Sequence, residues 1–260
     1  MDAVEQICKQ GYTILKGIIP EGKLTGVRND IIEAADKFGR RKPKNTYLAT
    51  TINHAQSFAP YVADPQIMAI VESFFGPYAR VSSTSTQINE PGNERGDWHS
   101  DWPFCPLNAG HIPKPIPDSV MHLTTLFMLV DFTQENGGTL MRPGSHKWGT
   151  NPTYDYEQIY DDYPDQIHGE GPAGSVLIMD SRLWHASAVN HTNERRTALV
   201  VRYAPWWLNL DVLMPGSRER KVIVDEPGIF GSSYPAVTQE AYDQINDIAK
   251  PLFRHWVHAR

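Results

Sequence analysis

The sequence has little cysteine, no excess of positive charge and no long apolar run, and each of these absences excludes a class of protein. Its 260 residues include only two cysteines, Cys8 and Cys105, in unlike surroundings, which favours a reducing compartment over a disulfide framework. Lysine and arginine total 24 against 30 acidic residues, so the net charge of −6 argues against a nucleic-acid binder. No stretch is apolar over the length that a bilayer requires. We therefore expect a cytoplasmic protein that binds neither nucleic acid nor a membrane.

Turn-forming residues are abundant, with 20 prolines and 19 glycines, whereas the sequence shows no internal repeat, low-complexity tract or linker. Such a composition favours a globular, turn-rich protein over a helical bundle or a disordered chain. A single domain of this length is normal for a β-barrel or a sandwich. We therefore expect residues 1–260 to form one domain.

Hydrophobic periodicity and turn residues predict the secondary structure. The predicted helices cover residues 2–10, 21–38, 65–75 and 238–253. The predicted strands cover residues 11–19, 82–89, 97–102, 120–132, 139–142, 175–180, 184–188 and 197–203. We expect a solvated turn at the basic cluster 40–44, with attraction of an anionic substrate as the alternative. We also expect a hairpin turn with Asn-Gly chemistry at 135–138 and an irregular excursion at 151–164 that includes at most one helix.

Two stretches depart from ordinary patterns. The strand at 82–89 is polar on both faces, which predicts either a wet pocket, where Ser85 or Gln87 would donate to a ligand, or an exposed edge strand. Residues 103–118 contain five prolines and are too long for an ordinary connection. We interpret them as a lid over the mouth of a site, with a surface loop that has no role as the alternative.

A possible metal site begins with His99 and Asp101, which lie two residues apart in a predicted strand and so point to the same face. With a distant His185 they make a 2-His-1-carboxylate triad, which leaves three positions of an octahedral iron open. The spacing alone is weak, because 10 histidines and 30 acidic residues give about one His-x-acid pair by chance. The other such pair, His168 and Glu170, lies in a turn-like stretch that would orient ligands loosely.

A second group of residues supports this site. Ser187 follows His185 by two residues, and Arg196 follows it by eleven on the next predicted strand. A dicarboxylate that chelates the iron would need a hydroxyl and a cation for its far carboxylate, and arginine makes that contact in a bidentate manner. Strand parity separates Arg196 from Arg195, and we expect Arg196 to point inward. Two exposed arginines after a hairpin are the alternative.

Four ordered motifs resemble one known family. They are Trp98-His99-Ser100-Asp101, the segment from Glu135 to His146, Gly171-Pro-Ala-Gly-Ser-Val, and His185-Ala-Ser187 with Arg196-Thr-Ala-Leu. Across about residues 10–205 their order and spacing resemble the phytanoyl-CoA dioxygenase family of Fe(II)/2-oxoglutarate oxygenases, and several motifs also look like those of ectoine hydroxylase.

The resemblance implies a mainly β fold with flanking helices, a double-stranded β-helix or jelly-roll, cupin-like barrel. It implies His99, Asp101 and His185 as iron ligands, and Arg196 with Ser187 at the distal carboxylate of 2-oxoglutarate. In related enzymes Fe(II), 2-oxoglutarate and O2 react to give succinate and CO2, and hydroxylation is the usual outcome. Halogenating relatives replace the carboxylate ligand by a small residue, so Asp101 disfavours halogenation.

The sequence also departs from the family pattern. A tryptophan that contacts 2-oxoglutarate in the phytanoyl enzyme falls near Leu126, and a lysine expected on the early strand is replaced by Ser85 or Gln87. The substrate therefore does not follow from the resemblance. Residues that flank the ligands or end strands at the presumed mouth are the substrate-binding candidates: Trp102, Phe104, Arg142, Arg202, Trp206 and Trp207. For Arg142, pairing with a carboxylate of the protein is the alternative.

Three functions remain open. The first is hydroxylation of an unactivated C–H bond in a small metabolite by an Fe(II)/2-oxoglutarate-dependent dioxygenase. The second uses the same site for desaturation, cyclisation, epoxidation or epimerisation of a natural-product intermediate. The third is a non-catalytic barrel that binds a metal or a metabolite, and the complete triad together with Arg196 weighs against it.

Overall fold

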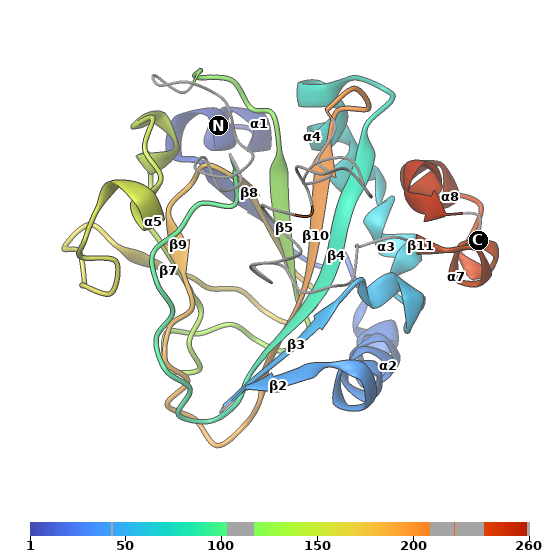
Figure 1. Ribbon diagram of the computed structural model, residues 1–260, viewed down its shortest axis with the longest axis horizontal. Helices are drawn as coiled ribbons and strands as arrows, with labels where there is room; N and C mark the ends of the chain where they lie inside the picture. Colours follow the sequence, from blue (N-terminus) through green and yellow to red (C-terminus); the bar gives the residue numbers. More distant parts are fainter. Residues whose placement is uncertain (43, 103–116, 209–220, 222–236, 259–260) are drawn as a thin grey trace.

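A seven-stranded antiparallel sheet runs through the molecule, and a smaller three-stranded sheet lies beside it (Figure 1). The computed structural model describes residues 1–42, 44–102, 117–208, 221 and 237–258. The order of the large sheet is β1-β8-β5-β10-β4-β3-β2, and that of the small sheet is β7-β6-β9. The strands of the large sheet are β1 (Tyr12–Leu15), β2 (Arg40–Lys42), β3 (Asn45–Ala49), β4 (Arg80–Asn89), β5 (Leu123–Met128), β8 (Val176–Asp180) and β10 (Arg196–Ala204). Those of the small sheet are β6 (Thr139–Met141), β7 (Ile167–Gly169) and β9 (His185–Ala186). The predicted mainly β barrel with flanking helices is confirmed, whereas the extent of one domain over residues 1–260 stays a prediction.

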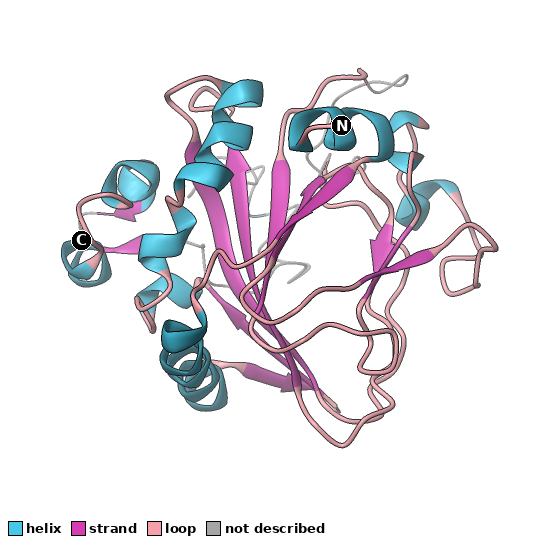
Figure 2. Cartoon of the chain, turned by 180° about the vertical axis from the view of Figure 1, so that it is seen from behind, coloured by secondary structure: helices cyan, strands magenta, loops and turns pink. Residues whose placement is uncertain are grey.

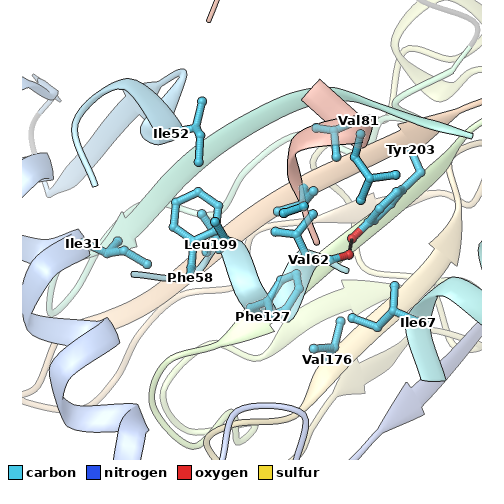
Figure 3. Packing of buried hydrophobic residues seen from close by; sticks show 14 of the residues in the cluster. Ile31, Ile52, Phe58, Val62, Ile67, Val81, Phe127, Val176, Leu199 and Tyr203 are labelled. Atoms are coloured by element: carbon cyan, nitrogen blue, oxygen red, sulfur yellow. Dashed lines mark hydrogen bonds between the residues drawn. The ribbon is translucent and has the colours of Figure 1, made fainter. Parts of the chain in front are cut away.

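Helices pack against one face of the large sheet, as Figure 2 shows from behind. They include α2 (Glu21–Phe38), α3 (Ala59–Val62) and α4 (Pro65–Phe75), and α1 (Ala3–Gln10) precedes the first strand. The interface is the main hydrophobic core, where Phe58 and Val62 meet Phe127 and Leu199 (Figure 3). The Tyr203 hydroxyl donates to the Val62 carbonyl oxygen at 2.7 Å, which satisfies a buried phenol inside this core.

The opposite face of the large sheet turns toward the small sheet. The buried residues of this inner cluster come from both sheets and the segments beside them: Leu126, Met128, Phe132, Met141, Leu177, Met179, Leu183 and Ala198. Along β10, Leu199 and Val201 belong to the helix-facing core, whereas Ala198 belongs to the inner cluster. Because side chains alternate along a strand, Arg196 and Arg202 share the inner face with Ala198. The interior therefore carries an arginine toward each end of β10.

Several predicted elements are confirmed. The helices at α1, α2 and α4 agree with their predicted ranges to within one residue. Asp2 and Glu5 form a capping box at the start of α1, and Asp64 caps α4 at the Gln66 N–H. Helix α5 (Pro152–Asp155) lies in the irregular excursion. No helix among the described residues is long and apolar enough to cross a membrane.

The polar strand at 82–89 lies inside the sheet and not at its edge. β4 pairs with β10 on one side and with β3 on the other, so the edge-strand alternative is wrong. The prediction of a turn at 40–44 is also wrong for residues 40–42, which form β2 and pair with β3. β2 and β3 therefore extend the large sheet where the sequence pattern predicted no strand.

The turn at 135–138 exists, but it does not close a hairpin. β5 pairs with β8 and β10, whereas β6 pairs with β7 and β9, so the turn joins two sheets. Gly137 has a φ of +81°, a left-handed conformation that glycine adopts without strain. The stretch around His168, predicted to be turn-like, forms β7.

Several predicted elements are shorter than expected, including the strands at 11–19 and 184–188, which form only β1 and β9. Residues 97–102 make only one isolated bridge, from His99 to His185, and the strand at 120–132 is ordered as β5 alone. The helix at 238–253 splits into α7 (Gln239–Gln244) and α8 (Lys250–Phe253). The Asn246 side chain accepts the Ala249 N–H at 2.8 Å and starts a new turn there, which leaves Ile248 exposed. Residues 103–116 of the predicted lid lie outside the described residues.

Candidate metal centre

His99, Asp101 and His185 come together although they arise from segments more than eighty residues apart. Their ligand atoms all lie within 4.8 Å of one another. His99 and His185 face each other across the antiparallel bridge, where each backbone N–H donates to the other residue's carbonyl oxygen at 3.0 and 2.9 Å. The bridge therefore fixes the two imidazoles, whose ring centroids are 4.3 Å apart. Among the described residues this is the only group of this kind that could hold a metal.

The two imidazoles are oriented in the same way. Nδ1 of His99 contacts the Asp97 carbonyl oxygen, and Nδ1 of His185 contacts the Leu183 carbonyl oxygen, each at 2.9 Å. A carbonyl only accepts, so each Nδ1 carries the proton and each Nε2 keeps its lone pair. This is the arrangement in which histidine binds a metal while its other nitrogen donates to the protein.

Charges within the group also suit a metal. Burial, and then the neighbouring His99, lower the pKa of His185 to about 4, so this imidazole is neutral at pH 7. Burial acts to raise the pKa of Asp101, but Arg202, the two histidines and a Thr124 hydrogen bond hold it well below its usual range. A neutral imidazole and an ionised carboxylate are the forms that bind a divalent cation.

Arg202 forms hydrogen bonds with the candidate ligand Asp101. Its Nη2 donates to Asp101 Oδ1 at 2.7 Å and its Nε donates to Oδ2 at 3.2 Å. The Thr124 hydroxyl donates to Oδ2 at 2.8 Å. A carboxylate offers about four acceptor positions, so three hydrogen bonds leave about one for a metal. The predicted substrate residue Arg202 is thus a partner of the candidate ligand Asp101.

Arg196 is a buried cation without a carboxylate partner among the described residues. Its side chain is 2% exposed, its Nε has no hydrogen-bond partner, and its guanidinium lies 4.8 Å from the Phe132 ring centroid. Burial lowers the pKa of Arg196 to about 10, which leaves it charged at pH 7. Arg195 points outward instead and pairs with Asp36 and Glu90. The orientation that parity predicts for these two arginines is what the structure shows.

A second unsatisfied donor lies beside Arg196. Asn89 pairs with Arg196 across β4 and β10, is fully buried, and its Nδ2 has no partner. Gln87, two residues earlier, donates from Nε2 to Asn45 Oδ1 at 3.3 Å and to Asn89 Oδ1 at 3.4 Å. Buried donors without acceptors are costly, so a cation and an amide left side by side fit an anion.

The remaining predicted co-substrate residues are Ser85, on β4, and Ser187, which follows β9. Ser85 is buried on the same face of β4 as Gln87, opposite Val200. Ser187 is half-buried, two residues after His185, and its carbonyl oxygen accepts the Gly96 N–H at 2.9 Å. Leu126 belongs to the inner cluster. Roles for these residues in co-substrate binding stay predictions.

The substrate candidates are scattered. Trp102 is buried next to Asp101, and its backbone N–H donates to the Ser181 carbonyl oxygen at 3.0 Å. Trp206 and Trp207 are 59% and 54% exposed, and Phe104 lies outside the described residues. None of these placements tests a role in substrate binding.

Arg142 lies away from the metal ligands. It forms a bidentate pair with Asp165 at 3.0 Å for both hydrogen bonds, and its guanidinium stacks 3.8 Å from the Tyr163 ring centroid. It also lies 5.3 Å from the Trp184 ring, which alternates with His185 along the chain. The structure therefore shows Arg142 paired with a carboxylate of the protein, which is the alternative given above. Because side chains alternate along a strand, this pair lies on the face of the small sheet opposite His185.

Sequence reasoning missed the residues that hold Asp101. Thr124 and its neighbours His122 and Ser181 have no metal-ligand spacing, and His122 reads as an ordinary histidine. The sequence held one signal for Arg202: alternation along its predicted strand placed Arg202 on the same face as Arg196.

The donor set fits the groups that the family resemblance implies. Two imidazole nitrogens and one carboxylate are the ligand set of non-haem Fe(II) oxygenases. The Arg196 guanidinium, which has no carboxylate partner among the described residues and lies beside the unsatisfied Asn89 amide, fits the far carboxylate of 2-oxoglutarate. The side chains of this protein therefore suit both Fe(II) and 2-oxoglutarate.

Comparison with known proteins agrees with this geometry. The chain is 33% identical over 143 residues to dioxygenase af480 of Aspergillus fumigatus, covering 55% of this chain and 42% of that protein. It is 26% identical over 159 residues to a probable alpha-ketoglutarate-dependent hypophosphite dioxygenase of Stutzerimonas stutzeri, covering 55% and 51%. The chain thus spans about half the length of these curated relatives.

A solved structure shows the same fold. The epimerase SnoN in complex with Fe3+, alpha ketoglutarate and nogalamycin RO superposes with a TM-score of 0.63 at 19% identity, covering 78% of this chain and 82% of SnoN. The model of the family described as phytanoyl-CoA dioxygenase (PhyH) matches residues 7–198, which is most of the chain. The chain belongs to the phytanoyl-CoA dioxygenase family.

Proposed function

We propose that this protein is a non-haem Fe(II)/2-oxoglutarate-dependent dioxygenase that hydroxylates an unactivated C–H bond of a small metabolite, with formation of succinate and CO2. The observation that carries the proposal is the pairing of two features in one barrel. The ligand atoms of His99, Asp101 and His185 lie within 4.8 Å of one another, and Arg196 is buried on the inner face with no counter-charge among the described residues.

Each side chain has a defined task in this function. His99, Asp101 and His185 would hold Fe(II), which together with 2-oxoglutarate supplies the activation of O2. The Arg196 guanidinium would bind the distal carboxylate of 2-oxoglutarate, with Asn89 as a second donor and Ser187 as the predicted hydroxyl partner. Arg202 holds Asp101 ionised and in place. The apolar inner cluster, which includes Leu126 and Ala198, lies on the same face of the large sheet as Arg196 and Arg202.

A second outcome of the same chemistry is desaturation, cyclisation, epoxidation or epimerisation of a natural-product intermediate. The structural likeness to SnoN, an epimerase of that cofactor class, favours keeping this alternative. All of these outcomes use the same iron and co-substrate residues, so the described site does not separate them. A cytoplasmic location is a further proposal, supported by the low cysteine content.

A substrate screen coupled to succinate formation tests the proposal. The wild-type protein with Fe(II), 2-oxoglutarate and O2 should release succinate in step with the conversion of one compound. His185→Ala should abolish this release, whereas His191→Ala, which changes an exposed histidine outside the ligand set, should retain it. The product mass then separates hydroxylation, which adds one oxygen, from desaturation, which removes two hydrogens. Succinate formation that survives His185→Ala would contradict the proposal.

A further inference from the structure

A series of four buried hydrogen bonds runs from Ser82 on β4 to the candidate ligand Asp101. His122 Nε2 lies 2.8 Å from the Ser82 hydroxyl, and His122 Nδ1 lies 2.8 Å from the Ser181 hydroxyl. The Ser181 hydroxyl lies 2.7 Å from that of Thr124, which donates to Asp101 Oδ2 at 2.8 Å. All five residues are buried, with exposed fractions of 8% or less.

The donors and acceptors in this series of hydrogen bonds can be assigned in only one way. The Thr124 hydroxyl donates its single proton to Asp101, whose two oxygens also accept from Arg202, so Thr124 must accept the Ser181 proton. Ser181 has no second proton, so His122 Nδ1 must be the donor to Ser181. Nε2 of His122 is then the acceptor, and it receives the Ser82 proton.

The opposite tautomer of His122 does not fit. With the proton on Nε2, the Nδ1 lone pair would face the lone pairs of Ser181 Oγ at 2.8 Å. A doubly protonated ring would leave the Ser82 proton without an acceptor in the chain. Burial, which is the largest cause, and the charge of Arg202 lower the pKa of His122 to about 3, so the ring is neutral at pH 7.

The backbone is shaped to bring these residues together. The register between β4 and β10 runs from the Arg202–Ser83 pair directly to the Tyr203–Val81 pair, which makes Ser82 the extra residue of a β-bulge. A bulge re-aims a side chain, and this one brings the Ser82 hydroxyl to His122. Ser181 is fixed from both sides, because its N–H donates to the His122 carbonyl oxygen and its own carbonyl oxygen accepts the Trp102 N–H.

We propose that His122 is a positioning residue for the metal site, acting through Ser181 and Thr124 to fix the orientation of Asp101. All donors in the chain point toward the carboxylate, so each bond polarises the next in the same sense. Thr124 and Arg202 together occupy three of the acceptor positions of Asp101, and the chain thereby sets Asp101 as a ligand through one oxygen. This inference rests on the proposed iron site.

Two substitutions of His122 separate positioning from packing. His122→Asn puts a side-chain N–H where Nδ1 stands and keeps the donor to Ser181. His122→Gln puts its amide near the Nε2 position, keeps contact with Ser82 and loses the donor to Ser181. Both variants lack the ring, so both lose similar packing.

Metal binding to the apo-protein is the first readout, with Co(II) as the probe and its visible absorption as the signal. His122→Gln should weaken Co(II) binding by about 10-fold, a usual effect of removing a partner of a metal ligand. His122→Asn should retain most of the affinity. Equal losses in the two variants, or no loss in either, would overturn the inference.

A matched pair on β5 gives the control. Thr124→Val removes the last link of the chain, whereas Thr125→Val removes a buried hydroxyl on the adjacent residue, which donates to the Val201 carbonyl oxygen at 2.8 Å. Both changes are isosteric, and each removes one hydrogen bond from a buried acceptor. Only Thr124→Val should weaken Co(II) binding, and an equal effect of Thr125→Val would reduce the chain to a structural role.

The tautomer of His122 is the second readout and does not depend on activity. Long-range 15N–1H correlation spectra of the Zn(II)-loaded protein should show His122 with its proton on Nδ1, and this signal should vanish in His122→Gln. A proton on Nε2 would overturn the inference. The proposed function fails separately, if wild-type protein binds no Co(II) while remaining folded.

Discussion

Asp101 is a buried carboxylate whose charge is balanced by Arg202 on one side and, in the proposed enzyme, by a metal on the other. The two side chains form a bidentate pair, and Arg202 is 21% exposed against 7% for Asp101. Removing one partner of a largely buried pair leaves the other charge uncompensated. The pair therefore links the stability of the apo-protein to the state of the metal site.

The first prediction follows from this link. Arg202→Gln should lower the free energy of unfolding of the metal-free protein by about 2 kcal/mol, less than for a fully buried pair because Arg202 reaches solvent. Saturating Mn(II) should recover part of that loss, because the metal replaces the missing positive charge. Urea unfolding with and without Mn(II) measures both values. A loss that is the same in the two conditions would contradict this account of Asp101.

Arg196 differs from Asp101, because it is a buried charge that has no ion-pair partner in the part of the chain that the structure describes. Replacing a buried charge that has no partner by an apolar residue of similar length is neutral or stabilising. Arg196→Met should therefore raise the free energy of unfolding in the absence of 2-oxoglutarate by about 1 kcal/mol. The same variant should lose the stabilisation that 2-oxoglutarate gives to the wild-type protein. Thermal unfolding with and without the co-substrate checks both parts, and a destabilised variant that still responds to 2-oxoglutarate would count against the role.

Spacing and parity predicted the ligands but not their surroundings. His99 and Asp101 share a face in any extended segment, and His185, Ser187 and Arg196 follow at fixed intervals. The partners of Arg142 and Arg202 depend on which strands meet in space, which spacing along one strand does not encode. Arg142 and Arg202 look alike in the sequence, yet one binds Asp165 on the far face of the small sheet and the other binds Asp101.

At the scale of elements, the turn before β8 is held against the segment that follows β1. Gly174 has a φ of +84°, and its carbonyl oxygen accepts the Ile19 N–H at 3.0 Å. A Cβ at this glycine would collide with the Ile19 carbonyl oxygen. The motif Gly171-Pro-Ala-Gly174 thus carries a backbone requirement of the fold.

The third prediction compares two glycines. Gly174→Ala should lower the free energy of unfolding by about 2 kcal/mol, because alanine is strained in the left-handed region and meets backbone. Gly26→Ala, in the exposed middle of α2 with open space around it, should raise the same free energy by about 0.5–1 kcal/mol. Denaturant unfolding of both variants checks the pair. Changes of the same sign would refute the assignment of strain to Gly174.

Element boundaries were predictable where a local signal set them. Asp2, Asp64 and the glycines after α1 and α4 mark helix ends in the sequence, and those helices agree with prediction. The bridge at His99 and the two-residue β9 were predicted too long, because their length is set by pairing between distant segments. β2 and β3 were missed for the same reason, since a basic cluster gives no hint of the partner strand.

At the scale of the molecule, burial of neutral histidines makes stability depend on pH. His122 has a pKa of about 3 in the folded protein against an ordinary value of 6.5, with burial the largest cause and Arg202, Asp101 and Arg80 the charges that act on it. Below pH 6.5 the unfolded chain takes up this proton and the folded protein does not. Stability therefore falls as the pH falls from 6.5 toward 3.

The fourth prediction isolates that contribution. Between pH 6 and pH 4 the metal-free wild-type protein should lose about 1.4 kcal/mol more per pH unit than His122→Gln, which has no proton to gain at this position. Urea unfolding across the pH range gives the two slopes. Parallel slopes would show that His122 is protonated in the folded protein, contrary to the direction assigned to its hydrogen bonds.

The central claim is that the metal ligands and Arg196 form one site, which binds Fe(II) and 2-oxoglutarate together. Anaerobic addition of Fe(II) and 2-oxoglutarate to the apo-protein tests it most directly, because a weak visible charge-transfer band arises only when both bind together at one site. We predict the band in wild-type protein and in His168→Ala, whose imidazole contacts the Gly138 carbonyl oxygen outside the ligand group, and its loss in His99→Ala. A folded, metal-loaded wild-type sample without the band would contradict the account.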